Sequence, residues 1–180
     1  MNKHKFISAV QEFVAIEAVG VSAIRGQGKG VLGKIRAYLG QLDLTLENVK
    51  TKDQFIEWLD IQTEKILDQL PLRNRPWGAA RKAINLFLRS CLYNKYLCKQ
   101  YNLHNYENWM EIPLDSAVAK GLRKEIQNKK FNKKIPRWPG LKYLEKETSD
   151  KYQQIAELVA AQNHLTAKVH FDIILWLENR

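Results

Sequence analysis

Apolar residues recur every three or four positions along most of the chain, which is the spacing of one face of an α-helix. No segment alternates apolar and polar residues as a half-buried strand would, so the pattern predicts an all-α fold. Thr51 is a suitable N-cap for one of the stronger helical segments. The segments expected to be helical are residues 3–19, 31–42, 52–70, 78–100, 115–127, 148–162 and 166–178.

The segments between these helices carry turn-forming or charged residues. Residues 22–30 contain three glycines and predict a loop. Residues 71–77 form a basic connection bounded by prolines, residues 101–112 an aromatic and irregular crossing, and residues 129–134 a basic run typical of a solvated loop. We expect a single domain over residues 1–180, built as two helical lobes that divide near 71–77 and enclose a cleft.

The charge of the chain indicates a polyanionic partner. It has 29 Lys and Arg residues against 19 Asp and Glu residues, a formal net charge of +10. Such an excess is typical of proteins that bind nucleic acid or an anionic membrane. No run reaches the roughly 18 to 20 apolar residues that span a bilayer. Glu12 and Glu17 interrupt the apolar N-terminal stretch, which argues against a signal peptide. We therefore expect a cytoplasmic, monomeric protein that binds DNA and no membrane.

The cysteines and histidines do not predict a metal centre. If Cys91 and Cys98 share the helix expected over residues 78–100, a rise of about 10 Å separates them, too far for a disulfide. Both are then interpreted as small core residues in a reducing compartment. The four histidines are scattered, without the spacing of metal ligands. We expect no metal and no other cofactor.

Two segments resemble the helix-hairpin-helix superfamily of DNA glycosylases. Residues 77–88, WGAARKAINLFL, resemble the second half of its hairpin motif: a glycine turn, a basic pair and an amphipathic helix. Residues 111–118, EIPLDSAV, resemble its short apolar block, in which an aspartate heads a helix that faces the cleft. The resemblance implies that Lys82 is the catalytic lysine of bifunctional members, that Asp115 is the general aspartate, and that residues 75–125 hold the hairpin element and the catalytic block.

Within the superfamily, the chain looks most like the archaeal 8-oxoguanine DNA glycosylases. The separation of 33 residues between Lys82 and Asp115 is similar to theirs. The last helix carries Asp172 and Trp176 one turn apart. In that branch, a pair with this spacing contacts the extruded base and stacks on it. One departure is Ala80, which stands where a hairpin glycine is usual, so the turn that cradles a phosphate could be distorted.

The chemistry of base excision requires residues of these types. An N-glycosidic bond breaks through a sugar cation, which a carboxylate near C1′ stabilises, and a neutral lysine amine can attack the same carbon. The base must leave the duplex, which requires an aromatic slot and polar groups that recognise its edge. Besides Asp172 and Trp176, the candidates for that pocket are Trp109 and Trp138. The candidate DNA contacts are Arg25, Gln27, Lys29, Arg75, Gly78 and Arg81.

Each candidate also has a purely structural interpretation. Asp115 could be only a helix N-cap, Lys82 only a surface lysine, and Asp172 and Trp176 a packed helix face. The leading hypothesis is a DNA glycosylase, with or without abasic-site lyase activity, that excises an oxidised purine or an enlarged modified pyrimidine, in DNA repair or in defence against phages. The alternatives are a non-catalytic nucleic-acid-binding module on the same scaffold and a helical adaptor for an acidic protein.

Overall fold

The computed structural model describes residues 2–24, 28, 30–71, 75–128, 134–165 and 167–179. Within these residues the chain is helical and contains no strand, which confirms the all-α prediction. None of the described helices is both long and apolar enough to cross a membrane. The elements are α1 (Lys3–Ala18), η1 (Val21–Ile24), α2 (Val31–Gly40), α3 (Lys52–Leu67), α4 (Trp77–Tyr93), α5 (Lys95–Tyr101), η2 (Leu103–Trp109), α6 (Ser116–Asn128), η3 (Leu141–Tyr143), α7 (Lys146–Gln162), η4 (Lys168–His170) and α8 (Phe171–Asn179), where η marks a 3₁₀ helix.

Side-chain caps determine where several of these helices begin. The Asn2 side chain accepts a hydrogen bond from the backbone N of Lys5 at 2.9 Å at the start of α1. Thr51 and Gln54 form a reciprocal capping box at the start of α3, which satisfies backbone N–H groups that the first turn of a helix leaves without partners. The cap expected at Thr51 is therefore present.

The helix expected over residues 78–100 is two helices. Its first part, α4, ends at Tyr93 because Asn94 adopts an extended backbone, with ψ 111°. The Asn94 side chain accepts hydrogen bonds from two backbone N–H groups of the following turn and so starts α5. Asparagine competes in this way with the helical hydrogen-bond pattern. Cys91 and Cys98 therefore lie on different helices rather than on one, and both thiols are free.

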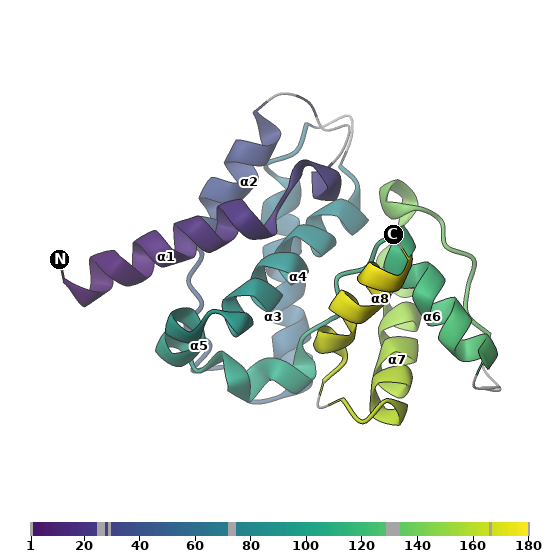
Figure 1. Cartoon of the computed structure of the whole chain (residues 1–180). Coiled ribbons are helices and arrows are strands. Elements are labelled where there is room, and N and C mark those ends of the chain that lie inside the picture. The colour runs from purple at the N-terminus through teal and green to yellow at the C-terminus, as the bar shows by residue number, and fades with distance from the viewer. Residues whose placement is uncertain are drawn as a thin grey trace.

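Two hydrophobic clusters form the interior. One is built mainly from α1 to α5 and includes Phe87, and the other is built from α6, α7 and α8 and includes Val159. Figure 1 shows these three C-terminal helices together on one side of the molecule and α1 to α5 on the other. The chain passes from the first cluster to the second between Met110 and Ile112, and it contacts the first again at Ala167 and Val169, before α8. The division into two lobes near residues 71–77 stays a prediction.

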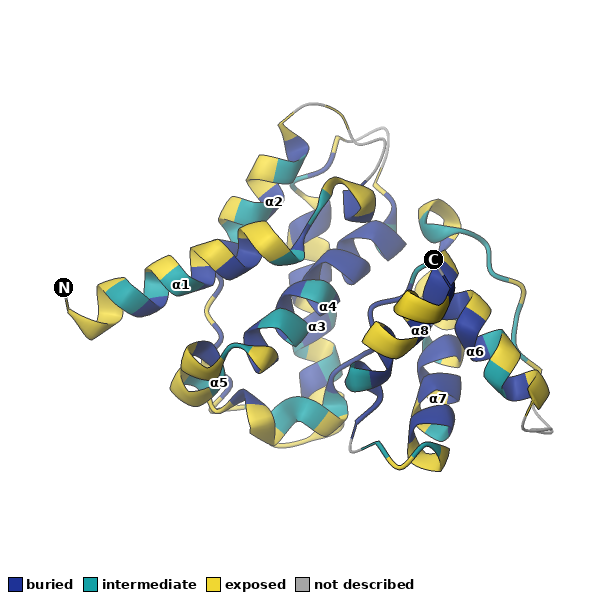
Figure 2. Ribbon diagram, viewed as in Figure 1, coloured by how far each residue is buried: buried dark blue, intermediate teal, exposed yellow. Residues whose placement is uncertain are grey.

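The helix α4 lies at the centre of this arrangement. It packs against α1, α3, α5 and η3, and Figure 2 shows buried residues along most of its length. Two of these buried residues, Arg81 and Lys82, are cations. A buried cation requires a carboxylate partner and hydrogen bonds. The partners of these two residues therefore show where charged groups meet inside the protein.

Candidate active site

The side chains of Lys82 and Asp115 form an ion pair. Lys82 lies in the second turn of α4 with 9% of its side chain exposed, and its Nζ donates to Asp115 Oδ2 at 2.9 Å. Asp115 stands immediately before α6, and its other oxygen, Oδ1, accepts from the backbone N of Ala117 at 2.9 Å and of Val118 at 3.0 Å. Asp115 therefore caps a helix with one oxygen and faces Lys82 with the other, so its two interpretations are compatible.

A pocket of about 410 Å³ opens beside this ion pair. Its walls come from the end of α1, from η1, from one face of α4, from the residue before α6 and from α8. Lys82, Asp115, Asp172 and Trp176 all line it. The structure thus brings together in one concave site four residues that the sequence singled out, from segments far apart along the chain.

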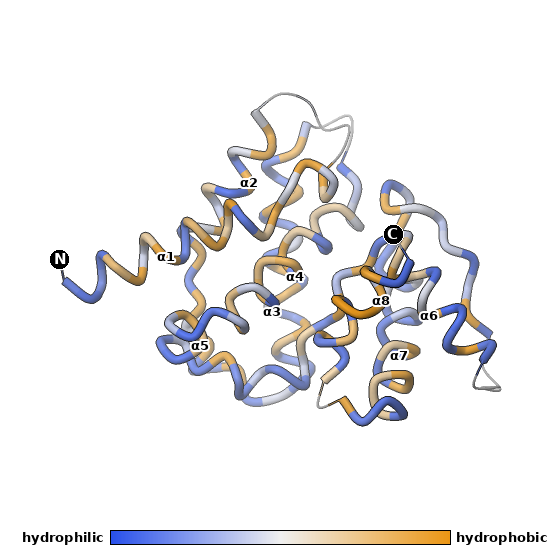
Figure 3. The backbone as a smooth tube through the Cα atoms, viewed as in Figure 1, coloured by the Kyte–Doolittle hydropathy of each residue, from blue (hydrophilic) through white to orange (hydrophobic). Residues whose placement is uncertain are grey.

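Asp172 and Trp176 occupy different positions in this pocket. Asp172 is 3% exposed, and its carboxylate forms an ion pair with Nη1 of Arg89. Trp176, one turn further along α8, leaves 41% of its surface exposed. The helix is strongly apolar, as Figure 3 shows. A partly exposed indole and a buried carboxylate therefore both line the pocket.

Arg89 is a pocket residue that the sequence reasoning missed. It lies two turns after Lys82 on α4, with Leu86 between them, and all three side chains line the pocket. Burial lowers the pKa of Arg89, and the nearby Tyr93 and Asp115 oppose that shift. Its Nε is buried and has no hydrogen-bond partner among the described residues. The spacing 82, 86 and 89 follows one helix face and was the available signal.

The structure places Arg81 in the interior, not on a DNA-binding surface. The residue is 2% exposed, and its guanidinium pairs with Glu111 and Asp60. Gly78 likewise lies inside α4 rather than in an exposed turn. A Cβ at Gly78 would come within 2.6 Å of the Leu141 carbonyl oxygen. This glycine therefore permits close packing of α4 against η3, and neither residue is available for a phosphate contact.

Two of the tryptophans expected in the base pocket lie elsewhere. Trp109 packs with Phe55 and Tyr106 at the edge of the first hydrophobic cluster. Trp138 makes an edge-to-face contact with Tyr152 in the second cluster, at a centroid distance of 5.3 Å. Neither lines the pocket that contains Lys82. Both are packing residues, in agreement with the structural interpretation open to large aromatic side chains.

The remaining candidate DNA contacts divide into two groups. Arg75 donates from Nε to the Leu67 carbonyl oxygen at 3.0 Å and pairs with Asp68, so it closes the C-terminal end of α3. The residues Arg25, Gln27 and Lys29 lie outside the described residues, as does most of the basic run 129–134, in which only Lys134 is described.

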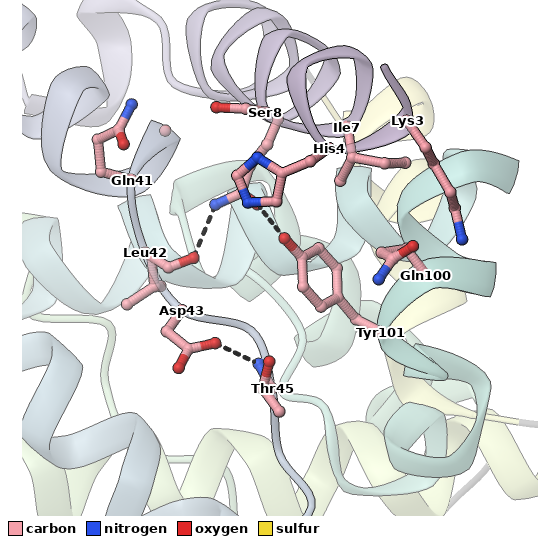
Figure 4. A pocket seen from close by; sticks show the side chains of 12 residues that line it. Lys3, His4, Ile7, Ser8, Gln41, Leu42, Asp43, Thr45, Gln100 and Tyr101 are labelled. Carbon is pink, nitrogen blue, oxygen red and sulfur yellow. Dashed lines mark hydrogen bonds between the residues drawn. The ribbon is translucent and has the colours of Figure 1, made fainter.

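A pocket of about 550 Å³ lies elsewhere, between the N-terminal half of α1, the segment after α2, and α5 (Figure 4). Its buried polar group, Gln11, donates to the carbonyl oxygens of Leu39 and Leu42 and accepts from the hydroxyl of Tyr101. These groups satisfy one another within the fold. None of the described candidate residues lines this pocket, so the site beside Lys82 is the better candidate for chemistry.

Comparisons of the chain with protein-family models, with curated proteins and with solved structures give no match. The case for a function therefore depends on the site itself.

Proposed function

We propose that this protein is a DNA glycosylase with abasic-site lyase activity, which excises an altered base through Lys82 and Asp115. The observation that carries the proposal is the ion pair of Lys82 and Asp115, at 2.9 Å, on the wall of a pocket that Trp176 and Asp172 also line. A nucleophile paired with a carboxylate, beside an aromatic surface, is the set of groups that excision of an extruded base requires.

The pair can perform the first chemical step in a defined order. Lys82 transfers a proton to Asp115 across their hydrogen bond and becomes a neutral amine. The amine attacks C1′ of the sugar, and the glycosidic bond breaks with its electron pair going to the departing base, which takes up a proton. Asp115 supplies that proton and, as a carboxylate again, stabilises the positive charge that develops at C1′ and O4′. It then takes up the proton that Lys82 Nζ loses on bonding to C1′. The product is a covalent bond between Lys82 Nζ and C1′.

The same bond leads to strand cleavage. Opening of the sugar ring converts the adduct to an imine between Lys82 and C1′, with the ring oxygen taking up a proton. Loss of a proton from C2′ then expels the 3′ phosphate by β-elimination, and water hydrolyses the imine to free Lys82. The protonated imine acts as the electron sink for this elimination, which is why a lysine serves better here than a water molecule.

The other pocket residues suit recognition of a base. Trp176 is a partly exposed aromatic side chain on which a base could stack, and stacking of a base on an aromatic side chain contributes about 1–3 kcal/mol. Arg89 and Asp172 place a donor group and an acceptor group beside it. A volume of about 410 Å³ falls within the range of small-molecule sites. These features fit an oxidised purine or an enlarged modified pyrimidine.

The charge of the whole chain and the apolar side chains near the pocket also support a nucleic-acid ligand. The formal charge of +10 favours a phosphate backbone. Exposed large apolar side chains gather on the elements that line the pocket, and such patches mark binding surfaces. They are Phe13, Ile16 and Val21 near the end of α1, and Ile173, Ile174, Trp176 and Leu177 on α8. In this proposal the two hydrophobic clusters are two lobes, and DNA binds across the pocket between them.

The direct test is to incubate the protein with duplexes that carry oxidised purines or phage-type modified pyrimidines and to identify the released bases by mass spectrometry. Release of one class of base supports the proposal and names the substrate. Tight binding of all duplexes with no base released would instead support a non-catalytic nucleic-acid-binding module.

A further inference from the structure

A buried ion pair holds the short segment around Glu111, where the chain crosses from the first hydrophobic cluster to the second; we call this segment the crossing. Glu111, at 3% exposure, lies one residue before the second cluster begins. Its carboxylate accepts two parallel hydrogen bonds from Arg81, from Nε at 2.8 Å and from Nη2 at 2.9 Å, and a third from Asn85 Nδ2 at 2.9 Å. Both donors belong to α4, so the crossing is attached to the helix that carries Lys82.

Arg81 is itself fixed from the opposite side. Its Nη1 donates to Asp60 Oδ1 at 2.8 Å and to Thr63 Oγ1 at 3.0 Å, both on α3. The guanidinium also lies 5.3 Å from the centroid of the Trp77 ring. A planar guanidinium with two parallel bonds to a carboxylate fixes direction as well as distance. With α3 holding its third nitrogen, the group has little freedom to rotate.

The next residue of the crossing is held by α7. The backbone N of Ile112 donates to Gln153 Oε1 at 3.0 Å, and Gln153 Nε2 donates to the Ile112 carbonyl oxygen at 2.9 Å. Glu111 and Ile112 are therefore bound to helices on both sides of the crossing. Only Pro113 and Leu114 separate this anchored pair from Asp115, and proline restricts the backbone of that short connection.

We propose that Arg81 and Glu111 are positioning residues that set the distance and direction between Lys82 and Asp115. This inference rests on the proposed function. Arg81 is the immediate neighbour of Lys82, and Glu111 stands four residues before Asp115, so the buried pair acts as a second, parallel link between the same two segments. Asp115 reaches Lys82 with one oxygen only; the Arg81–Glu111 link keeps the two segments in register while Lys82 gives up its proton and moves toward the sugar.

The energetics favour a geometric role over a contribution to stability. Replacing a buried ion pair by apolar residues of similar size is often neutral or stabilising for a fold. A catalytic pair, in contrast, is sensitive to small displacements, because an error of about 1 Å can reduce a rate by about 100-fold. We therefore expect the link between Arg81 and Glu111 to affect the rate beyond any effect of Glu111 on stability.

The test compares Glu111→Gln with Val159→Ala. Val159 is fully buried in the second cluster and does not line the pocket, so its substitution reports a general loss of packing. We expect Glu111→Gln to reduce the single-turnover rate of imine formation on an abasic duplex by about 10- to 100-fold. Its Kd for the same duplex should change less than 2-fold, and Val159→Ala should alter neither quantity. If Glu111→Gln does not fold, Arg81→Lys keeps the charge and removes the parallel hydrogen bonds.

A second measurement does not depend on activity. Amine-selective labelling of each protein, with modification of Lys82 quantified by mass spectrometry, reports how well Asp115 protects its Nζ. We expect faster labelling of Lys82 in Glu111→Gln and wild-type labelling in Val159→Ala. If wild type itself forms no imine, faster labelling of Lys82 in Glu111→Gln would refute the proposed function and retain the positioning role. Unchanged labelling with an unchanged rate of imine formation would overturn the positioning role, as would equal losses in both variants.

Discussion

Arg89 of α4 and Asp172 of α8 form an ion pair across the pocket that Lys82 and Asp115 also line. The pair joins an element of the first hydrophobic cluster to an element of the second. It therefore contributes both to the shape of the pocket and to the attachment of α8.

Asp172→Asn tests this attachment. The substitution keeps the shape of the side chain and removes its charge, and Asp172 is 3% exposed. We expect the free energy of unfolding to fall by about 2 kcal/mol, as for loss of a buried charged hydrogen bond. The control is Asp68→Asn, whose carboxylate pairs with Arg75 at the surface with 69% of the side chain exposed; it should change stability by no more than about 1 kcal/mol. Equal losses in urea denaturation would show that the Asp172 pair has no special role.

Trp176→Ala separates stacking from packing. Because Trp176 is 41% exposed, its removal should lower the melting temperature only slightly. If the indole stacks on the extruded base, the single-turnover rate of base release should fall by about 10-fold or more, since stacking contributes about 1–3 kcal/mol.

Trp109→Ala is the matched control for that experiment, because Trp109 packs with Phe55 and Tyr106 away from the pocket. We expect it to destabilise the protein by about 3 kcal/mol and to leave the rate of the folded fraction unchanged. A large drop in melting temperature for Trp176→Ala, without a specific loss of rate, would assign Trp176 to packing.

Glu111 makes the stability of the fold sensitive to acid. Burial alone would raise the pKa of Glu111, but the charge of Arg81 and hydrogen bonds from Arg81 and Asn85 hold it below the ordinary value of 4.5. A carboxyl group whose pKa is lowered by folding stabilises the native state above its unfolded pKa, and this contribution is lost as the pH falls through the folded pKa. Wild type should therefore lose more free energy of unfolding than Glu111→Gln below about pH 4.5. Parallel stability curves for the two proteins would argue against the shift.

Binding to DNA should depend steeply on salt. Each phosphate neutralised by the protein contributes about −0.9 to the slope of log affinity against log salt concentration, and a formal charge of +10 predicts several contacts. Lys29→Ala, in the glycine-containing segment, should reduce the magnitude of the slope by about one contact. Lys99→Ala on α5 is the control and should not, because α5 does not line the pocket. A slope near zero for wild type would exclude a nucleic-acid ligand and favour an adaptor for an acidic protein.

The local parts of the fold were predictable from the sequence, because helical periodicity and capping residues act over a few positions. The cap at Thr51 is an example. The break at Asn94 was not predicted, since an asparagine in an apolar helical pattern gives only a weak signal until its side chain is seen to bind the next turn.

The position of Arg81 shows why the site was predictable only in part. Next to Lys82 in the sequence, it looked like half of an exposed basic pair. Its partners Asp60 and Glu111 come from positions 21 residues before and 30 residues after it, and no local pattern signals that three such groups will meet in the interior. For Arg89, the spacing 82, 86 and 89 placed it on the helix face of Lys82, but its pairing with Asp172, 83 residues away, had no such local signal.

Reduction of the reaction mixture with borohydride tests the central claim most directly. If Lys82 attacks C1′, borohydride converts the imine to a stable covalent adduct of protein and DNA, visible as a shifted band in a denaturing gel. We expect the adduct with wild type and none with Lys82→Ala, while DNA affinity falls by no more than one phosphate contact. Asp115→Asn should slow base release strongly and retain the fold, because asparagine also caps helices well. An adduct that persists in Lys82→Ala, or full activity in Asp115→Asn, would contradict the assignment of this site.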